Sequence, residues 1–106
     1  MSTDYNSLKT KVTKLPKVTT RPMFGYQCYT ISKKFFVGFN NKNSHEIIVR
    51  LPKQLSESVI KKKGVKPFSH GAKTGWIEID VKIVSPLTAY KLITNGYDYA
   101  KELSKK

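Results

Sequence analysis

Hydrophobic and polar positions alternate in three short runs in the first half of the chain. The runs are residues 23–31 (MFGYQCYTI), 35–40 (FFVGFN) and 46–51 (EIIVRL). Apolar side chains at every second position are typical of half-buried β-strands. Polar turns at 32–34 and 41–44 separate the runs, and Asn and Ser in them tolerate the backbone angles of tight turns. The pattern predicts an antiparallel meander.

A later strand is predicted over residues 76–84 (WIEIDVKIV), with Ile77, Ile79, Val81 and Ile83 facing the core. On the opposite face, alternation gathers an aromatic set: Phe24, Tyr26, Phe36 and Trp76. Two interpretations stay open. The favoured one is that a helix covers this face and the aromatic rings form a second core layer. The other is that the rings stay open beside lysines and stack unpaired bases.

Three segments have helical spacing: residues 4–15, 52–64 and 86–104. Ser85-Pro86 is a strong start for the last of these, because a hydroxyl caps the helix and proline there forfeits no hydrogen bond. Gly96 within it marks either a break or a close approach. The expected fold class is α+β: a single antiparallel meander sheet with an N-terminal helix, a central helix and a C-terminal helix.

At 106 residues the chain is expected to be one domain, 1–106, with its own core. The lone Cys28 cannot form an internal disulfide, which favours a reducing compartment. No apolar run approaches the ~20 residues that a membrane span needs, and the first residues lack the features of a signal peptide. We therefore expect a cytoplasmic protein with no membrane partner.

The formal net charge of +13 favours association with DNA, RNA or an acidic protein. Arg21 and Arg50 are the only arginines among 20 basic residues, so the surface suits phosphate contact better than base recognition. An AT-rich coding sequence, with no binding role for the lysines, is the neutral alternative. A protein–protein adaptor or a self-associating domain, such as a homodimer, is the competing class. The predicted nucleic-acid contacts are Lys17, Arg21, Lys61, Lys62, Lys63, Lys66 and Lys73.

Catalytic and metal-binding patterns are weak. Cys28, His45 and His70 lack the spacing of metal ligands, and Ser69-His70 has no evident orienting carboxylate. Glu78 and Asp80 share a strand face, which is more typical of a solvated surface meeting lysines. We expect no cofactor, no metal and no enzymatic activity.

Several segments together suggest a family. Arg21-Pro22-Met23-Phe24-Gly25 leads into the meander, Gly64-Val65-Lys66-Pro67-Phe68 follows the second helix, and Trp76 opens the later strand. From about Arg21 to Lys101 the chain resembles the N-terminal domain of the TfoX/Sxy family of competence regulators, related in fold to the YjbR/MmcQ-like proteins. The resemblance implies an α+β domain of the kind found in double-wing DNA-binding proteins, a role in transcriptional regulation, and no catalytic residues.

We expect Met23-Phe24-Gly25 to be structural. A glycine within a strand usually marks a bulge or the close approach of another backbone. Phe24 is then expected to anchor the corner in the core, and Gly25 to leave no room for a Cβ.

Overall fold

The structure is a computed structural model that describes residues 3–23, 25–43, 45–69 and 71–104. The expected anchor Phe24 and the candidate ligand His70 lie outside the described residues. The helices are α1 (Thr3–Thr13), α2 (Lys53–Val59) and α3 (Pro86–Ser104), with a short 3₁₀ turn, η1 (Ala72–Thr74). The strands are β1 (Val18–Met23), β2 (Tyr26–Ile31), β3 (Lys34–Asn40), β4 (Glu46–Arg50), β5 (Val65–Pro67) and β6 (Trp76–Asp80).

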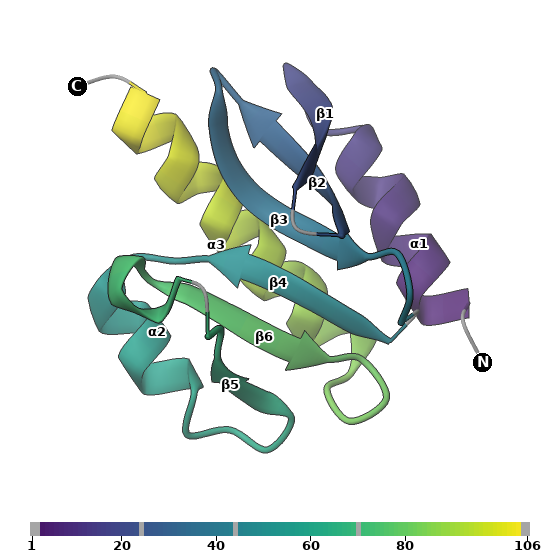
Figure 1. Cartoon of the computed structure of the whole chain (residues 1–106), viewed down its shortest axis with the longest axis vertical. Helices are drawn as coiled ribbons and strands as arrows, with labels where there is room; N and C mark the ends of the chain where they lie inside the picture. The colour runs from purple at the N-terminus through teal and green to yellow at the C-terminus, as the bar shows by residue number, and fades with distance from the viewer. Residues whose placement is uncertain (1–2, 24, 44, 70, 105–106) are drawn as a thin grey trace.

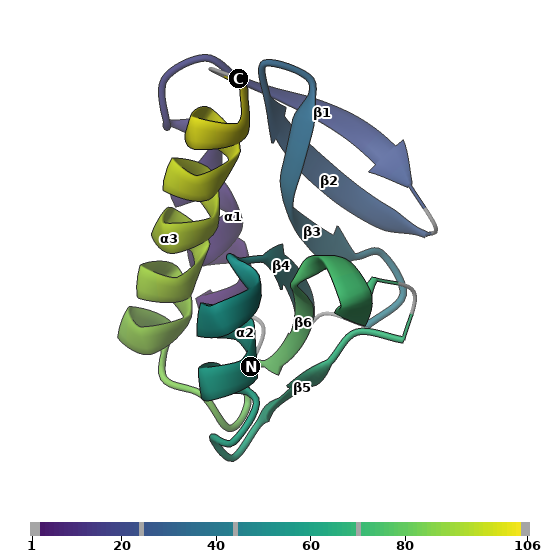
Figure 2. The ribbon, with the colours of Figure 1, turned by 90° about the vertical axis from the view of Figure 1, so that its left-hand side faces the viewer.

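The strands form one antiparallel sheet in the order β1-β2-β3-β4-β6-β5 (Figure 1). The three helices lie on the same side of this sheet (Figure 2). Phe68, which follows β5, packs on the other face of the sheet. This face is hereafter called the open face, because none of α1, α2 and α3 lies against it (Figure 2). The predicted α+β fold, with a meander and N-terminal, central and C-terminal helices, is confirmed.

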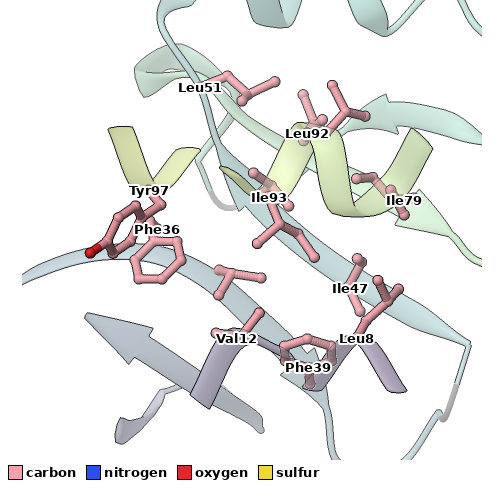
Figure 3. Packing of buried hydrophobic residues seen from close by; sticks show 14 of the residues in the cluster. Leu8, Val12, Phe36, Phe39, Ile47, Leu51, Ile79, Leu92, Ile93 and Tyr97 are labelled. Atoms are coloured by element: carbon pink, nitrogen blue, oxygen red, sulfur yellow. The ribbon is translucent and has the colours of Figure 1, made fainter. Parts of the chain in front are cut away.

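The main core fills the space between the helices and the sheet (Figure 3). Leu8 and Val12, one helical turn apart, bring α1 into it. Helix α3 starts where the sequence predicts, and its first turn is capped by the Ser85 hydroxyl, which accepts a hydrogen bond from the Thr88 amide at 3.3 Å. The side chains with the least exposure include Phe36, Phe39, Ile47, Leu51, Ile79 and Ile93.

Gly96 lets α3 approach the sheet. A Cβ at this position would lie 2.8 Å from the Arg50 carbonyl oxygen and 2.9 Å from a methyl group of Val49. Real Cβ atoms are almost never found that close to other heavy atoms. Of the two explanations that the sequence left open, close packing is therefore the right one.

Pro16 ends the first helical pattern, and the sequence after it predicts a basic loop at Lys17–Pro22; this prediction was wrong. Residues 18–23 form β1, which pairs with β2 from Val18 opposite Ile31 to Met23 opposite Tyr26. The β-branched residues Val18 and Thr19 favour a strand. Pro22 is tolerated because β1 is an edge strand of the sheet and needs no outward amide.

Strand β3 departs from simple alternation. Its register with β2 shifts between Tyr29 and Thr30, so that Phe35 and Val37 have partners on β2 and Phe36 has none. Such a bulge turns the extra residue out of phase and bends the strand. The prediction that put Phe36 on the open face is therefore wrong: Phe36 is buried in the main core, and Phe35 is on the open face instead.

Two further expectations were wrong. Gly25 is not crowded, because a Cβ there would have no neighbour within 4 Å; it has a φ of +79°, which L-residues adopt at a cost. Ile83 does not face the core. Strand β6 ends at Asp80, whose carbonyl accepts the Ile83 and Val84 amides in a turn, and Ile83 is 51% exposed.

Candidate nucleic-acid interface

The open face has an apolar cluster of its own. Tyr26, Cys28, Ile48 and Phe68 are buried in it, and Met23, Phe35 and Trp76 pack against it while half-buried. Phe68, from the segment after β5, folds over the sheet and meets the Tyr26 ring edge-to-face, with centroids 5.7 Å apart. The Phe68 amide donates to the Trp76 carbonyl at 3.1 Å. This face is thus covered by a loop and not by the predicted helix.

Coverage by a loop leaves a groove of about 290 Å³ at one end of the face. Phe35, Phe68 and Trp76 provide its aromatic walls. Met23, Lys33, Lys34, Arg50 and Thr74 complete the lining, so none of the described lining residues is acidic.

Arg50 lines this groove, and Arg21, the other arginine of the chain, contacts one of its aromatic walls. Arg21, directly opposite Cys28 in the register, has its guanidinium carbon 6.0 Å from the centroid of the Phe35 ring. Arg50, directly opposite Trp76, donates from Nε to the Thr74 carbonyl at 3.3 Å and lies 5.8 Å from the Tyr99 ring centroid. Ring contacts of this kind hold a guanidinium in place while leaving its other donors available.

The two lysines of the groove are positioned by a tight hairpin. Ser32 and Lys33 join β2 to β3 with φ values of 51° and 70°, the left-handed pair that two-residue hairpin turns require. Ile31 pairs with Lys34 across this turn. The turn therefore presents Lys33 and Lys34 side by side at the end of the sheet.

Acidic residues gather at the other end of the same ladder. A second cavity, of about 370 Å³, is lined by Glu46, Glu78 and Asp80, together with His45 and Lys66. Glu46 pairs with Asp80 in the register while Arg50 pairs with Trp76, so the two sites are four residue steps, roughly 13 Å, apart along β4. The open face is thus positive at one end and negative at the other.

The carboxylates of the acidic cavity have hydrogen-bond and ion-pair partners within the protein. The Tyr26 hydroxyl donates to Glu46 Oε2 at 2.9 Å, and Lys66 Nζ lies 3.2 Å from Glu78 Oε2. Burial, and then the hydrogen bond to Glu46, raise the pKa of Tyr26. Burial and the neighbouring Glu46 raise the pKa of Glu78, and Lys66 opposes that rise. These carboxylates are occupied by partners within the protein.

The predicted contact residues fall into separate groups. Arg21 lies at the groove, and exposed Lys73 is adjacent to Thr74 of its lining. Three predicted residues, Lys61, Lys62 and Lys63, are exposed after α2. Lys66 borders the acidic cavity, and Lys17 lies in the turn before β1.

The sequence did not predict four other residues of the groove: Lys33, Lys34, Arg50 and Phe35. Arg50 and Trp76 on neighbouring strands were a usable signal for the groove, but the pairing of β4 with β6 was not evident from the sequence.

Of the candidate metal ligands, the structure describes Cys28 and His45. Cys28 is fully buried in the open-face cluster, where burial raises the pKa of its thiol to about 11. His45 borders the acidic cavity. In the described part of the chain, no three His, Cys, Asp or Glu residues come together as a metal site, and no described helix is long and apolar enough to cross a membrane.

No protein-family model matches the chain, and no curated protein matches it in sequence. Two solved structures share its fold. One is the Deinococcus radiodurans protein DR2400, with a DUF419 domain: 14% identity, a TM-score of 0.77, and coverage of 92% of this chain and 80% of that one. The other is a Pseudomonas syringae structural-genomics target: 15% identity, a TM-score of 0.71, and coverage of 90% and 97%. The TM-scores establish a shared small α+β fold, and identities this low show nothing beyond the fold. The resemblance to TfoX/Sxy stays a prediction.

Proposed function

We propose that this protein is a non-enzymatic domain that associates with nucleic acid through the groove on its open face. The observation that supports this most directly is the separation of charge along one sheet face. Lys33, Lys34 and Arg50 line a groove whose described lining contains no carboxylate, while Glu46, Glu78 and Asp80 lie at the far end of the same ladder. A phosphate backbone is attracted to the first end and repelled from the second.

Arg21 and Lys73 extend the cationic surface beyond the groove lining. In this proposal the lysines that do not line the groove add weaker, unspecific attraction to phosphate: Lys17, Lys61, Lys62, Lys63 and Lys66. A role in a transcription complex in the cytoplasm is the finer form of the proposal, and it is motivated by the resemblance to the TfoX/Sxy N-terminal domain.

The test is fluorescence anisotropy with labelled single-stranded and duplex DNA at increasing salt. Log affinity should fall with log salt by roughly 0.9 per phosphate neutralised on duplex DNA and 0.7 on a single strand. Lys34→Glu/Lys73→Glu reverses one charge of the groove lining and one beside it. Lys61→Glu/Lys62→Glu is the matched control because it changes the net charge equally. We expect the first pair to weaken binding at least several-fold more than the second. Equal effects, or no binding at low salt, would contradict the proposal.

A self-associating domain is the second candidate, and two exposed apolar side chains favour it. Leu87 is 81% exposed at the start of α3, and Ile83 is 51% exposed in the turn before it. If they form an interface, Leu87→Lys should convert a dimer to a monomer in sedimentation equilibrium, whereas the groove variant Lys34→Glu/Lys73→Glu should leave the mass unchanged.

A further inference from the structure

We propose that the groove takes a single-stranded segment whose unpaired bases stack on Trp76 and Phe35. This inference rests on the proposed nucleic-acid association and specifies its ligand. The starting observation is that these two rings stay half-buried, whereas Tyr26 and Phe68 of the same cluster are at least nine-tenths buried. Both half-buried rings line the groove. Phe68 lines it too but is almost fully buried, so Phe35 and Trp76 are the aromatic rings of the lining that keep accessible surface.

The two arginines lie near the aromatic rings, where they can contact the phosphates of a strand whose bases stack on those rings. Arg50 is opposite Trp76 in the β4–β6 ladder, and Arg21 lies over Phe35 at 6.0 Å. Phe35 thus has a guanidinium over its ring, and Trp76 has an arginine as its cross-strand neighbour. Proteins that bind single strands pair aromatic faces, which hold bases, with cations that follow the backbone. An arginine plane also offers a stacking surface of its own.

The shape of the site favours an unpaired strand over a duplex. Duplex bases are reached by a convex helix or ribbon inserted into a groove about 12 Å wide. Here the aromatic rings line a concavity of about 290 Å³, close to the lower limit of ordinary ligand pockets. Bases that are splayed out of a strand can enter such a concavity, whereas stacked and paired bases cannot.

Trp76 is the only tryptophan in the chain, so its fluorescence reports on the groove directly. The experiment titrates the protein with a twelve-nucleotide thymidine strand, an abasic strand with the same number of phosphates, and a duplex of equal length. We expect the thymidine strand to quench Trp76 and to bind roughly tenfold to a hundredfold more tightly than the abasic strand. The abasic strand should bind by charge without quenching.

Phe35→Leu and Trp76→Leu keep an apolar side chain while removing the stacking face. Measured by anisotropy on variants whose circular dichroism matches that of the parent, each should lower thymidine-strand affinity at least several-fold and leave abasic-strand affinity unchanged. Equal affinity for thymidine and abasic strands, or tighter duplex binding, would overturn this inference while leaving the proposed association intact. No binding by any of the three ligands at low salt would overturn both.

Discussion

The rings of Phe36 and Tyr97 meet edge-to-face, with centroids 5.4 Å apart and planes inclined at 72°. Phe36 is the unpaired residue of the β3 bulge, and Tyr97 lies on α3, where its hydroxyl donates to the Pro16 carbonyl at 2.7 Å. The contact therefore joins the central strand, the C-terminal helix and the turn after α1. It exists only because the bulge redirects Phe36 toward the helices.

This arrangement predicts different effects for two adjacent phenylalanines. Phe36→Ala should lower the free energy of unfolding by about 3–5 kcal/mol, because the ring is fully buried. Phe35→Ala should cost about 1–2 kcal/mol, because that ring is half-exposed at the groove. Urea unfolding measures both, and Phe36→Leu substitutes if the alanine variant does not fold. The reverse order would mean that β3 keeps regular alternation.

The same bulge marks the limit of what the sequence could predict for the fold. In a regular strand such as β4, alternation predicted correctly which side chains share a face: Ile47 and Val49 are in the main core and Ile48 is on the open face. A bulge leaves no comparable signal in FFVGFN, because Phe35 and Phe36 are equally apolar. Only the pairing with β2 determines which of the two is buried.

Gly25 offers a test of backbone conformation against crowding. With φ at +79° and no neighbour within 4 Å of a Cβ, Gly25→Ala should destabilise the protein by about 1–2 kcal/mol through backbone strain. Gly25→Asn should cost clearly less, because asparagine adopts left-handed angles more readily. Thermal melting compares the two variants. If the larger asparagine were the worse substitution, crowding would be the cause after all.

The candidate site was less predictable than the fold. Composition indicated a basic surface, but Arg21 and Arg50 are 29 positions apart, and they reach one groove only through the order of the strands. Lys33 was visible as a turn residue, and nothing in the sequence placed its turn beside Trp76. Sites assembled from distant strands depend on which strands pair with one another, and that order is known here only from the structure.

Cys28 should be chemically inert in the folded protein. Its side chain is fully buried, and burial raises the pKa of the thiol to about 11, so very little reactive thiolate is present near neutral pH. A thiol-reactive dye should therefore label Cys28 only as fast as local or global unfolding exposes the thiol. Phe36→Ala should accelerate labelling by destabilising the fold, whereas Arg21→Ala should not. Rapid labelling of the stable native protein would contradict the burial of Cys28.

The last prediction concerns Glu78 and pH. Burial and the neighbouring Glu46 raise the pKa of Glu78 above its ordinary value, with Lys66 opposing the rise, so the folded state holds the proton more tightly than the unfolded chain does. The stability that this protonation contributes is complete below the unfolded pKa and is lost as the pH rises through the folded pKa.

Glu78→Gln removes that titration. Its melting temperature, relative to the parent, should increase as the pH is raised from about 4 to 7. The lost contact with Lys66 should matter little, because the lysine side chain is 72% exposed. Glu57→Gln, at an exposed position on α2, is the matched control for removing one negative charge from a basic protein. If the difference in melting temperature stays constant with pH, or if the control reproduces it, the pKa of Glu78 is not raised in the folded protein.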